Sequence, residues 1–238
     1  MAASASKRQQ AAATSTAPTG PVSKSDVVSY IANLDANGQG YQVAREVVQN
    51  LKKQKRYSET ESLGYGEVDV SSFFDLLSVV CKADDTQIKS GTFLDIGSGT
   101  GKAVLTAATF GFENSVGIEI VKELHDLART FCHDTQKAYP GVINARFILG
   151  SCFGEEELWS SAQVIFLPIT LFTDDNVQQI ESLVSSRVKP ETILLSTTRR
   201  LSSRNLAYLS NYRLKLFKGS LSVHCYKCIS ATTTDSSG

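Results

Sequence analysis

The amino-acid sequence predicts an α/β fold with a seven-stranded, mostly parallel sheet, and three observations support this expectation. Five short apolar runs alternate with helical stretches between residues 92 and 197. Each run is apolar throughout, as expected of a strand that is buried on both faces of a parallel sheet. Two further strand-like runs follow with no helix between them, which indicates an antiparallel C-terminal hairpin added to the sheet edge. This arrangement is Rossmann-like.

The expected elements are defined by apolar spacing and by turn residues. A small helical N-terminal segment comes first, with helices at 26–34 and 41–55. Ser71 and Ser72 can cap a third helix, whose apolar residues from Phe73 onward fall on one face. The remaining elements are strands at 92–96, 115–120, 145–149, 163–167 and 192–197, helices at 102–110, 121–136 and 174–188, and a hairpin that joins 212–217 to 221–229.

Four segments are expected along the chain. Residues 1–23 are too poor in large apolar groups to offset the entropy of ordering, so we expect a disordered tail. The helical segment covers 24–60, the main domain covers 61–230, and residues 231–238 form a second disordered tail. The first tail lacks the apolar centre of a secretory signal, and its lack of acid is only weakly typical of an organellar transit peptide.

The composition excludes several classes of protein. With 24 Lys and Arg against 24 Asp and Glu, the chain lacks the positive field that drives binding to phosphate backbones, so no sequence-specific nucleic-acid partner is expected. No apolar run is long enough to span a membrane. The odd number of cysteines, five, favours a reducing compartment. Lys52, Lys53, Lys55 and Arg56 suit a helix C-terminus, and a basic docking patch is the alternative interpretation.

A glycine-rich turn joins the first strand of the sheet to the helix that follows it. From Asp95 to Lys102 the turn reads D-I-G-S-G-T-G-K. A dinucleotide-binding turn needs glycine where Lys102 stands, and a phosphate-binding P-loop needs Ser or Thr where Ala103 stands. The pattern that remains, D-x-G-x-G-x-G, is the signature of seven-stranded S-adenosylmethionine-dependent methyltransferases.

The residue types of this turn suit such a cofactor. Glycines lack a Cβ atom, so the backbone can approach the methionyl part of the ligand near a helix N-terminus. Asp95 at the strand tip can meet the ammonium group of the ligand, directly or through water. Glu119 ends the next strand, where a carboxylate can accept both ribose hydroxyls. The cofactor contacts expected from this region are Asp95, Gly97, Ser98, Gly99, Gly101, Lys102 and Glu119.

Further motifs on both sides of the turn resemble those of one family. They are Tyr65-Gly66-Glu67 ahead of it, then V-G-I-E at 116–119, A-Q-V-I-F at 162–166, V-K-P at 188–190 and K-G-S-L-S-V at 218–223. Over roughly residues 60–229 the chain resembles the disruptor-of-telomeric-silencing family of non-SET histone lysine methyltransferases. The resemblance implies S-adenosyl-L-methionine as cofactor, with Tyr65, Gly66 and Glu67 in a loop that closes over its methionine end.

Two segments depart from the pattern of that family. The family has Gly-Asp-Phe after the third strand, where the Asp meets the adenine amine, whereas this chain reads Gly150-Ser151-Cys152-Phe153. Ser151 and Phe153 are therefore the expected adenine contacts. The family segment Val-Asn-Asn-Phe, which lines the lysine channel, is replaced by Leu167-Pro168-Ile169-Thr170. The acceptor side is thus less well defined than the cofactor side.

The resemblance implies a protein lysine as methyl acceptor, with a histone in a nucleosome as candidate partner and the nucleus, or else the cytoplasm, as location. The channel is expected to contain Tyr65, Leu167, Ile169, Thr170 and Phe172, and Tyr65, Thr170 and Phe172 are the candidate catalytic residues. None is expected to act as a general base, because an apolar channel beside a cationic donor favours the neutral amine. Two alternatives stay open: another acceptor, such as a non-histone protein or a small molecule, and a non-catalytic domain that binds the cofactor or a partner.

Other residues that could carry chemistry are expected to be structural. Cys225 and Cys228 lack the second pair of ligands that a structural zinc site needs, so no metal is expected, and Cys225 is assigned to an edge strand. His125 and His133 fall on one predicted helix and are expected at the surface.

Overall fold

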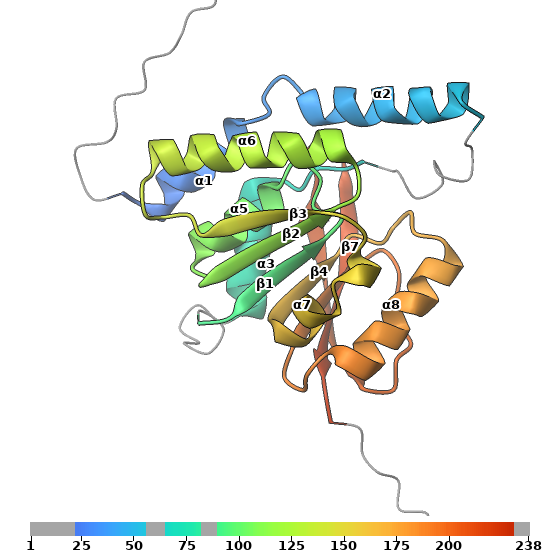
Figure 1. Ribbon diagram of the computed structural model, residues 1–238. Helices are drawn as coiled ribbons and strands as arrows, with labels where there is room; N and C mark the ends of the chain where they lie inside the picture. The colour runs from blue at the N-terminus through green and yellow to red at the C-terminus, as the bar shows by residue number, and fades with distance from the viewer. Residues whose placement is uncertain (1–21, 56–64, 82–89, 231–238) are drawn as a thin grey trace, which may run out of the picture.

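The sheet of the computed structural model has seven strands in the order β3-β2-β1-β4-β5-β7-β6 (Figure 1). The first five are parallel, and β7 pairs antiparallel with both β5 and β6. This confirms the predicted mostly parallel sheet with a C-terminal hairpin. The strands are β1 (Thr92–Ile96), β2 (Asn114–Glu119), β3 (Ala145–Leu149), β4 (Ala162–Leu167), β5 (Ile193–Thr197), β6 (Leu206–Lys215) and β7 (Ser220–Cys228).

The structure describes residues 22–55, 65–81 and 90–230. The predicted tail at 231–238, all of the predicted tail at 1–23 except its last two residues, and the predicted boundary at 60/61 lie outside the described residues, as does Arg56.

Helices cover both faces of the sheet. They are α1 (Lys24–Asn33), α2 (Gln39–Lys53), α3 (Val70–Val80), α5 (Lys102–Phe110), α6 (Lys122–Ala138), α7 (Glu156–Ser161) and α8 (Asp174–Arg187), with a 3-10 turn η2 (Cys152–Gly154). Helices α3 and α5 pack with strand residues such as Phe93 and Phe166, and α7 and α8 pack on the opposite face with Leu94 and Ile165. None of the described helices is both long and apolar enough to cross a membrane.

The C-terminal hairpin differs from the prediction in its length and its order. Strand β6 begins at Leu206, six residues before the predicted start at Tyr212. Its first half was hidden in the sequence because the pairing register with β7 shifts between Tyr208 and Ser210, which breaks the alternation of polar and apolar residues. Since β6 forms the sheet edge, Cys225 on β7 lies in an inner strand, which corrects the expectation for that residue.

Two further expectations concern single residues. Cys225 packs with the apolar cluster on one face of the sheet and Cys228 with the cluster on the other, so their side chains cannot meet at one metal ion. His125 is buried in α6 rather than exposed, because that face of the helix turns toward the sheet. The expected surface position of His125 is therefore wrong.

The cap of α3 also differs from the prediction. The Asp69 side chain, rather than that of Ser71 or Ser72, accepts a hydrogen bond from the backbone N–H of Ser72, at 2.8 Å. We expect Asp69→Ala to lower the free energy of unfolding by about 1 kcal/mol, the usual cost of losing such a cap. Ser71→Ala, an exposed change in the first turn of the same helix, is the matched control and should cost less in thermal unfolding. Equal losses would contradict the assignment.

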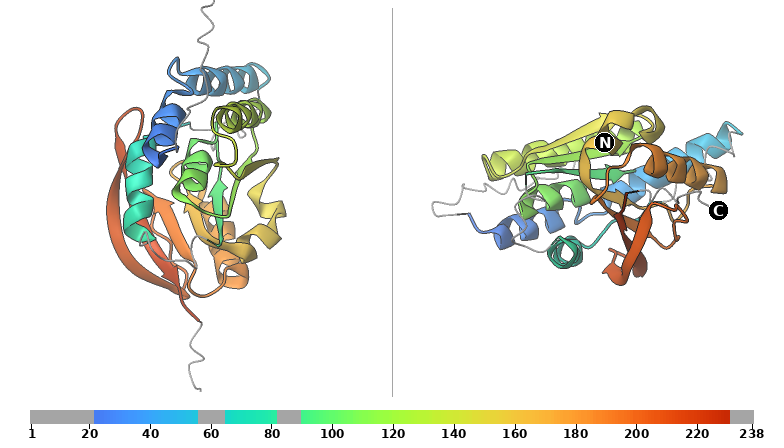
Figure 2. Two further views of the ribbon diagram at one scale, coloured as in Figure 1. Left: turned by 90° about the vertical axis from the view of Figure 1, so that its left-hand side faces the viewer. Right: turned by 90° about the horizontal axis from the view of Figure 1, so that it is seen from below.

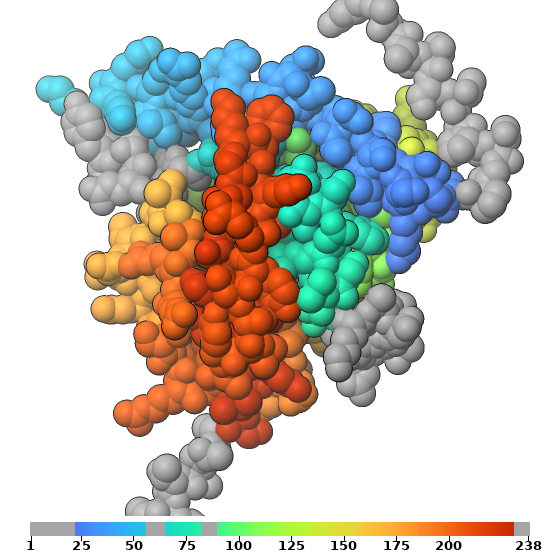
Figure 3. Space-filling model, turned by 180° about the vertical axis from the view of Figure 1, so that it is seen from behind, coloured from blue at the N-terminus to red at the C-terminus, as the bar shows by residue number. Residues whose placement is uncertain are grey.

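The predicted site residues lie at the carboxyl end of the parallel strands. Helix α2 lies across this end (Figure 1 and the left view of Figure 2), whereas α1 packs beside α5 and α3. From behind, the β6–β7 hairpin reaches up to the N-terminal helical segment (Figure 3), and the rings of Tyr41 on α2 and Phe217 at the hairpin turn are 5.7 Å apart. The loops that follow the parallel strands are thus enclosed by α2 on one side and by the hairpin on another.

Candidate active site at the carboxyl end of the sheet

A cavity of about 720 Å³ lies at the carboxyl ends of β1 to β4. Its lining comes from the glycine turn after β1, from the loops after β2, β3 and β4, and from the segment 65–68. Helix α2 and the β6–β7 hairpin complete the walls. This is where ligands bind in open parallel sheets, so the cavity is the candidate active site.

The glycine turn adopts the backbone conformation for which its glycines are needed. Gly97, Gly99 and Gly101 have left-handed φ angles of 79°, 54° and 84°. Gly97 and Gly99 line the cavity, and a Cβ atom at Gly97 would meet nothing within 4 Å. Gly101 does not line the cavity: a Cβ atom there would lie 2.5 Å from Cζ of Phe147. We therefore correct the expectation that Gly101 touches the cofactor, because its glycine permits close packing of α5 on β3.

Two buried polar side chains beside this turn lack a partner. Within the described part of the chain, Asp95 Oδ1 and Ser98 Oγ make no hydrogen bond, although both residues line the cavity. Burial raises the pKa of the Asp95 carboxyl well above its usual range, and the nearby charge of Glu119 raises it further. Buried polar groups without partners are rare in native proteins, which indicates that a polar ligand completes this site.

Glu119 stands at the end of β2 on the other side of the turn. Its carboxylate accepts hydrogen bonds from the backbone N–H of Gly99, at 2.7 Å, and of Val121, at 2.8 Å. Burial raises the pKa of Glu119, while these N–H groups act in the opposite direction by stabilising the carboxylate. The structure thus brings together Asp95, Ser98 and Glu119, as the sequence predicts.

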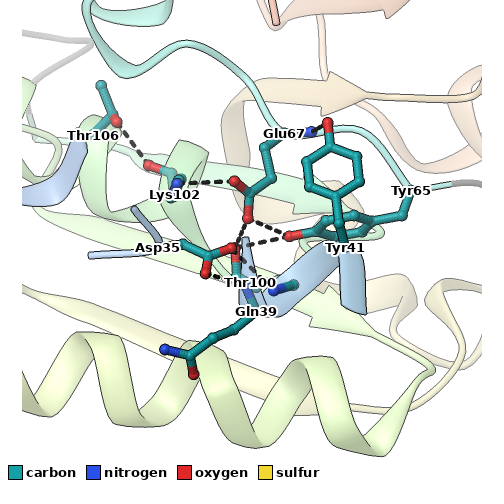
Figure 4. Close-up of polar contacts among 9 residues, drawn as sticks. Asp35, Gln39, Tyr41, Tyr65, Glu67, Thr100, Lys102 and Thr106 are labelled. Carbon is teal, nitrogen blue, oxygen red and sulfur yellow. Dashed lines mark hydrogen bonds and ion pairs between the residues drawn. The ribbon is translucent and has the colours of Figure 1, made fainter. Parts of the chain in front are cut away.

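The segment 65–67 supplies the most connected group of the site (Figure 4). Glu67 is 5% exposed, and its Oε2 forms an ion pair of 2.8 Å with Nζ of Lys102, itself 6% exposed. Glu67 Oε1 accepts hydrogen bonds from the hydroxyls of Tyr65 and Thr100. Burial alone would raise the pKa of Glu67, but the hydrogen bonds from Lys102 and Tyr65 and the charge of Lys102 lower it overall. The result is a buried carboxylate and a buried ammonium side by side on the cavity wall.

Two residues of the N-terminal helical segment join this group, and neither was predicted to belong to the site. Tyr41 on α2 accepts a hydrogen bond from the backbone N–H of Glu67, at 3.3 Å, and its ring meets the ring of Tyr65 edge to face at 5.0 Å. Asp35, in the turn before α2, lies beside the Glu67 carboxylate (Figure 4), and each of these carboxyls shifts the pKa of the other. Thr100 was also missed, because it occupies a variable position of the glycine motif.

The loop after β3 borders another part of the cavity. Ser151 and Phe153, the expected adenine contacts, both line it, and the Ser151 hydroxyl accepts a hydrogen bond from the backbone N–H of Phe153, at 3.3 Å. Ile120, which follows Glu119, also lines the cavity and is 64% exposed. The predicted strand 115–120 included Ile120, so this second apolar contact was not predicted.

The loop after β4 contains the predicted channel residues, and the structure divides them. Thr170 and Phe172 line the cavity, and Thr170 Oγ1 lies 3.0 Å from Oγ1 of Thr197. Leu167 and Ile169 are fully buried in the apolar core on the α8 side of the sheet, so their expected place in a channel is wrong. The backbone N–H of Ile169 bonds the Leu167 carbonyl at 2.8 Å, and this tight turn directs both side chains away from the cavity.

An apolar wall that the sequence did not reveal faces the cavity from the other side. It consists of Val68, Leu214, Leu216 and Leu221, together with Ala44, Val47 and Leu51 of α2. Val68 pairs with Leu216 through a backbone bridge, which fixes the segment 65–68 to the hairpin. Across the described ranges, no three His, Cys, Asp or Glu side chains gather as metal ligands would.

Solved structures with a similar fold include methyltransferases. One is an RNA methyltransferase from Salinibacter ruber in complex with S-adenosyl-L-homocysteine, which is 22% identical, with a TM-score of 0.52 over 68% of this chain and 94% of that chain. Another is a putative methylase from Haemophilus influenzae, 16% identical, with a TM-score of 0.50 over 68% of this chain and 88% of that one. At such identities the likeness concerns the fold alone.

The amino-acid sequence itself identifies the family. A search of curated proteins gave no match. The family model described as histone methylation protein DOT1, however, matches residues 43–230, which is most of the chain and includes the segment 65–67, the glycine turn and the hairpin. The chain therefore belongs to the DOT1 histone methylation family and is an S-adenosylmethionine-dependent methyltransferase.

Proposed function

We propose that this methyltransferase modifies a lysine side chain of a protein, with a histone in a nucleosome as first candidate and the nucleus as its compartment. One observation carries the proposal: the polar groups suited to the cofactor share one cavity with Phe172 and with the apolar wall that includes Val68 and the hairpin leucines. A lysine amine has a reference pKa of about 10.4 and must lose its proton before it can accept a methyl group. Apolar surroundings disfavour the ammonium form and so assist that loss.

The residues of the cavity fit S-adenosylmethionine. The methionine end of this cofactor carries one ammonium and one carboxylate, which match the charges of Glu67 and Lys102. We assign Glu119 to the ribose hydroxyls, and Asp95, whose Oδ1 lacks a partner in the described residues, to a polar contact near the ammonium. Ser151, Phe153 and Ile120 are assigned to the adenine ring.

The chemistry requires little acid or base catalysis. When bound, S-adenosylmethionine supplies a methyl group on a cationic sulfur that is already a good leaving group. The lone pair of the neutral lysine nitrogen forms the new N–C bond, and the electrons of the broken C–S bond stay on sulfur. The protein contributes alignment, which we assign to Thr170 and Phe172 on the acceptor side.

Tyr65 is not proposed as a base. Burial raises the pKa of its phenol, and the charge of Glu67 raises it further, so the hydroxyl stays protonated and donates to Glu67. Its role is to hold the Glu67 carboxylate and to form part of the cavity wall.

The acceptor class can be tested directly. The full chain is incubated with tritiated cofactor and, separately, with nucleosomes, free histones, total cell protein and a metabolite extract. The proposal predicts label in nucleosomal histone, released as methyl-lysine on hydrolysis, and no label with Glu67→Ala. Label that appears only in metabolites or in other proteins would overturn the histone assignment.

A second candidate function is methyl transfer to a different acceptor. The hydroxyl of Thr170, in the loop where the sequence departs from the family pattern, lies 3.0 Å from that of Thr197 at the end of β5 and 3.1 Å from that of Thr198. Such a group can hydrogen-bond an acceptor other than a lysine. The same labelling experiment separates the two candidates, and cofactor binding without label in any pool would favour a non-catalytic domain.

The assignment of Asp95 predicts opposite effects on stability and on binding. Because the pKa of Asp95 is raised in the folded protein, the stability that depends on its proton is lost as pH rises through that value. Asp95→Asn removes the ionisable group, so its Tm should exceed that of the wild type at pH 8 and by less at pH 5. Its affinity for S-adenosylhomocysteine should fall about ten-fold or more, as expected for a lost hydrogen bond to a charged group.

Thermal unfolding at the two pH values and calorimetry check this prediction. Asp175→Asn, an exposed change on α8, is the matched control and should alter neither quantity. An Asp95→Asn variant that binds as tightly as the wild type would remove Asp95 from the cofactor site.

A further inference from the structure

Asp35 is a buried carboxyl that the assigned functional groups do not include. It lies in the turn between α1 and α2, is 2% exposed, and precedes the region that matches the family model, which begins at residue 43. It is also absent from the lining of the cavity. A carboxyl this deeply buried needs partners, and Asp35 has two kinds.

The first partners belong to α2. The two carboxyl oxygens of Asp35 accept hydrogen bonds from the backbone N–H groups of Gln39 and of Gly40, the latter at 3.0 Å, so Asp35 caps the start of this helix. That first turn packs directly on the site: a Cβ atom at Gly40 would lie 2.2 Å from the hydroxyl oxygen of Tyr65 and 2.8 Å from Cγ2 of Thr100. Anchoring α2 therefore also fixes two side chains that contact Glu67.

The second partner is the Glu67 carboxylate itself. Asp35 lies beside the Glu67 carboxylate, next to the hydroxyls of Tyr65 and Thr100 (Figure 4), and each of the two carboxyls shifts the pKa of the other. An Asp35 that keeps its proton can donate a hydrogen bond to Glu67. Burial raises the pKa of Asp35, and the hydrogen bond to Glu67 and the charge of Glu67 raise it further, against the opposing effect of the backbone N–H groups. The protonated Asp35, the Glu67 carboxylate and the Lys102 ammonium then form a group with no net charge.

We propose that Asp35 is a positioning residue for the cofactor, which holds the Glu67 carboxylate and the first turn of α2 around the methionine end. The inference rests on the proposed assignment of Glu67 to that end. In this arrangement Glu67 is fixed from three directions, by Asp35, by the hydroxyls of Tyr65 and Thr100, and by Lys102. The N-terminal helical segment then contributes to cofactor binding by positioning Glu67.

The test is the affinity of the full chain for S-adenosylhomocysteine, measured by calorimetry for two variants of Asp35. Asp35→Ala should weaken binding about ten-fold or more, because it removes a hydrogen bond to a charged group. Asp35→Asn keeps one donor for Glu67 and one acceptor for α2, so its Kd should stay within about three-fold of the wild-type value. This change is smaller than the ten-fold weakening expected of Asp35→Ala, which corresponds to about 1.4 kcal/mol. Equal weakening by both variants would overturn the proposal.

A matched control separates positioning from general stability. Ser23→Ala removes the side chain that caps α1 in the same segment, at a distance from Glu67 in the chain and outside the cavity lining. It should lower Tm without changing affinity. If Ser23→Ala weakens binding as much as Asp35→Ala does, the effect of Asp35 is only structural and the proposal fails.

A double-mutant cycle then tests the route through Glu67. If Asp35 acts through that carboxylate, Asp35→Ala should have little further effect in a Glu67→Gln background, whereas additive losses would overturn the proposal. If Glu67→Gln weakens binding and Asp35→Ala does not, only the inference about Asp35 fails. If neither change weakens binding, the assignment of Glu67 in the proposed function fails as well.

Discussion

Lys102→Met is expected to lower the free energy of unfolding by about 3–5 kcal/mol, because it leaves the Glu67 carboxylate buried without its ion-pair partner. The two charged groups are 2.8 Å apart and almost fully excluded from solvent, so water cannot replace the lost ammonium. The same variant should lose measurable affinity for S-adenosylhomocysteine, since it removes the cation assigned to the carboxylate of the ligand. Thermal unfolding and calorimetry measure the two effects.

The pH dependence of this loss has a defined sign. In the wild type the pKa of Glu67 is lowered, so the stability contributed by its carboxylate is present above the ordinary Glu pKa of about 4.3 and is lost as pH falls further. Without Lys102 the buried carboxylate prefers to be protonated. The difference in stability between wild type and Lys102→Met should therefore narrow as pH is lowered toward 4.

The double variant Lys102→Met/Glu67→Gln is the control. It has no unpaired buried charge, and it should recover much of the lost stability while still failing to bind the ligand. If the single variant unfolds at the wild-type temperature, the ion pair does not contribute to the stability of the fold. If the double variant binds normally, neither charge contacts the methionine end.

The cofactor side of the site was predictable because its residues belong to one short motif and to the end of the neighbouring strand. Asp95, the glycines and Glu119 lie on two adjacent parallel strands whose carboxyl ends must meet at one edge of the sheet. A strand pattern and a local motif therefore suffice to bring them together. The segment 65–67 was found differently, through the resemblance to a family, since no local pattern connects it to the glycine turn.

The rest of the site depends on tertiary docking that the sequence does not encode locally. Asp35 meets Glu67 across 32 positions of chain only because α1 packs on α5 and α6 and so places the turn before α2 above the glycine turn. The prediction for Leu167 and Ile169 failed for a local reason: the chain makes a tight turn directly after β4, so position in the loop did not determine which side chains face the cavity. Thr170 and Phe172, further along the same loop, do face it.

Gly101→Ala is expected to cost about 2–4 kcal/mol in the free energy of unfolding, the sum of left-handed backbone strain and overpacking. Its φ of 84° is unfavourable for a residue with a Cβ atom, and that atom would lie 2.5 Å from the Phe147 ring and 3.2 Å from Cβ of Ala128. Those neighbours belong to β3 and α6, so the change would push α5 away from both elements.

Gly97→Ala is the matched comparison, because its φ of 79° is similar but a new Cβ atom there meets nothing within 4 Å. Only the backbone strain of roughly 1–2 kcal/mol should affect its stability. The new methyl group of Gly97→Ala, however, projects from a position that lines the cavity. For a given loss of stability, Gly97→Ala should therefore lose more affinity for S-adenosylhomocysteine than Gly101→Ala does. Denaturant unfolding and calorimetry on both proteins measure the two rankings. The reverse order, with Gly101→Ala stable but unable to bind, would show that Gly101 rather than Gly97 touches the ligand and that the cavity wall has been assigned wrongly.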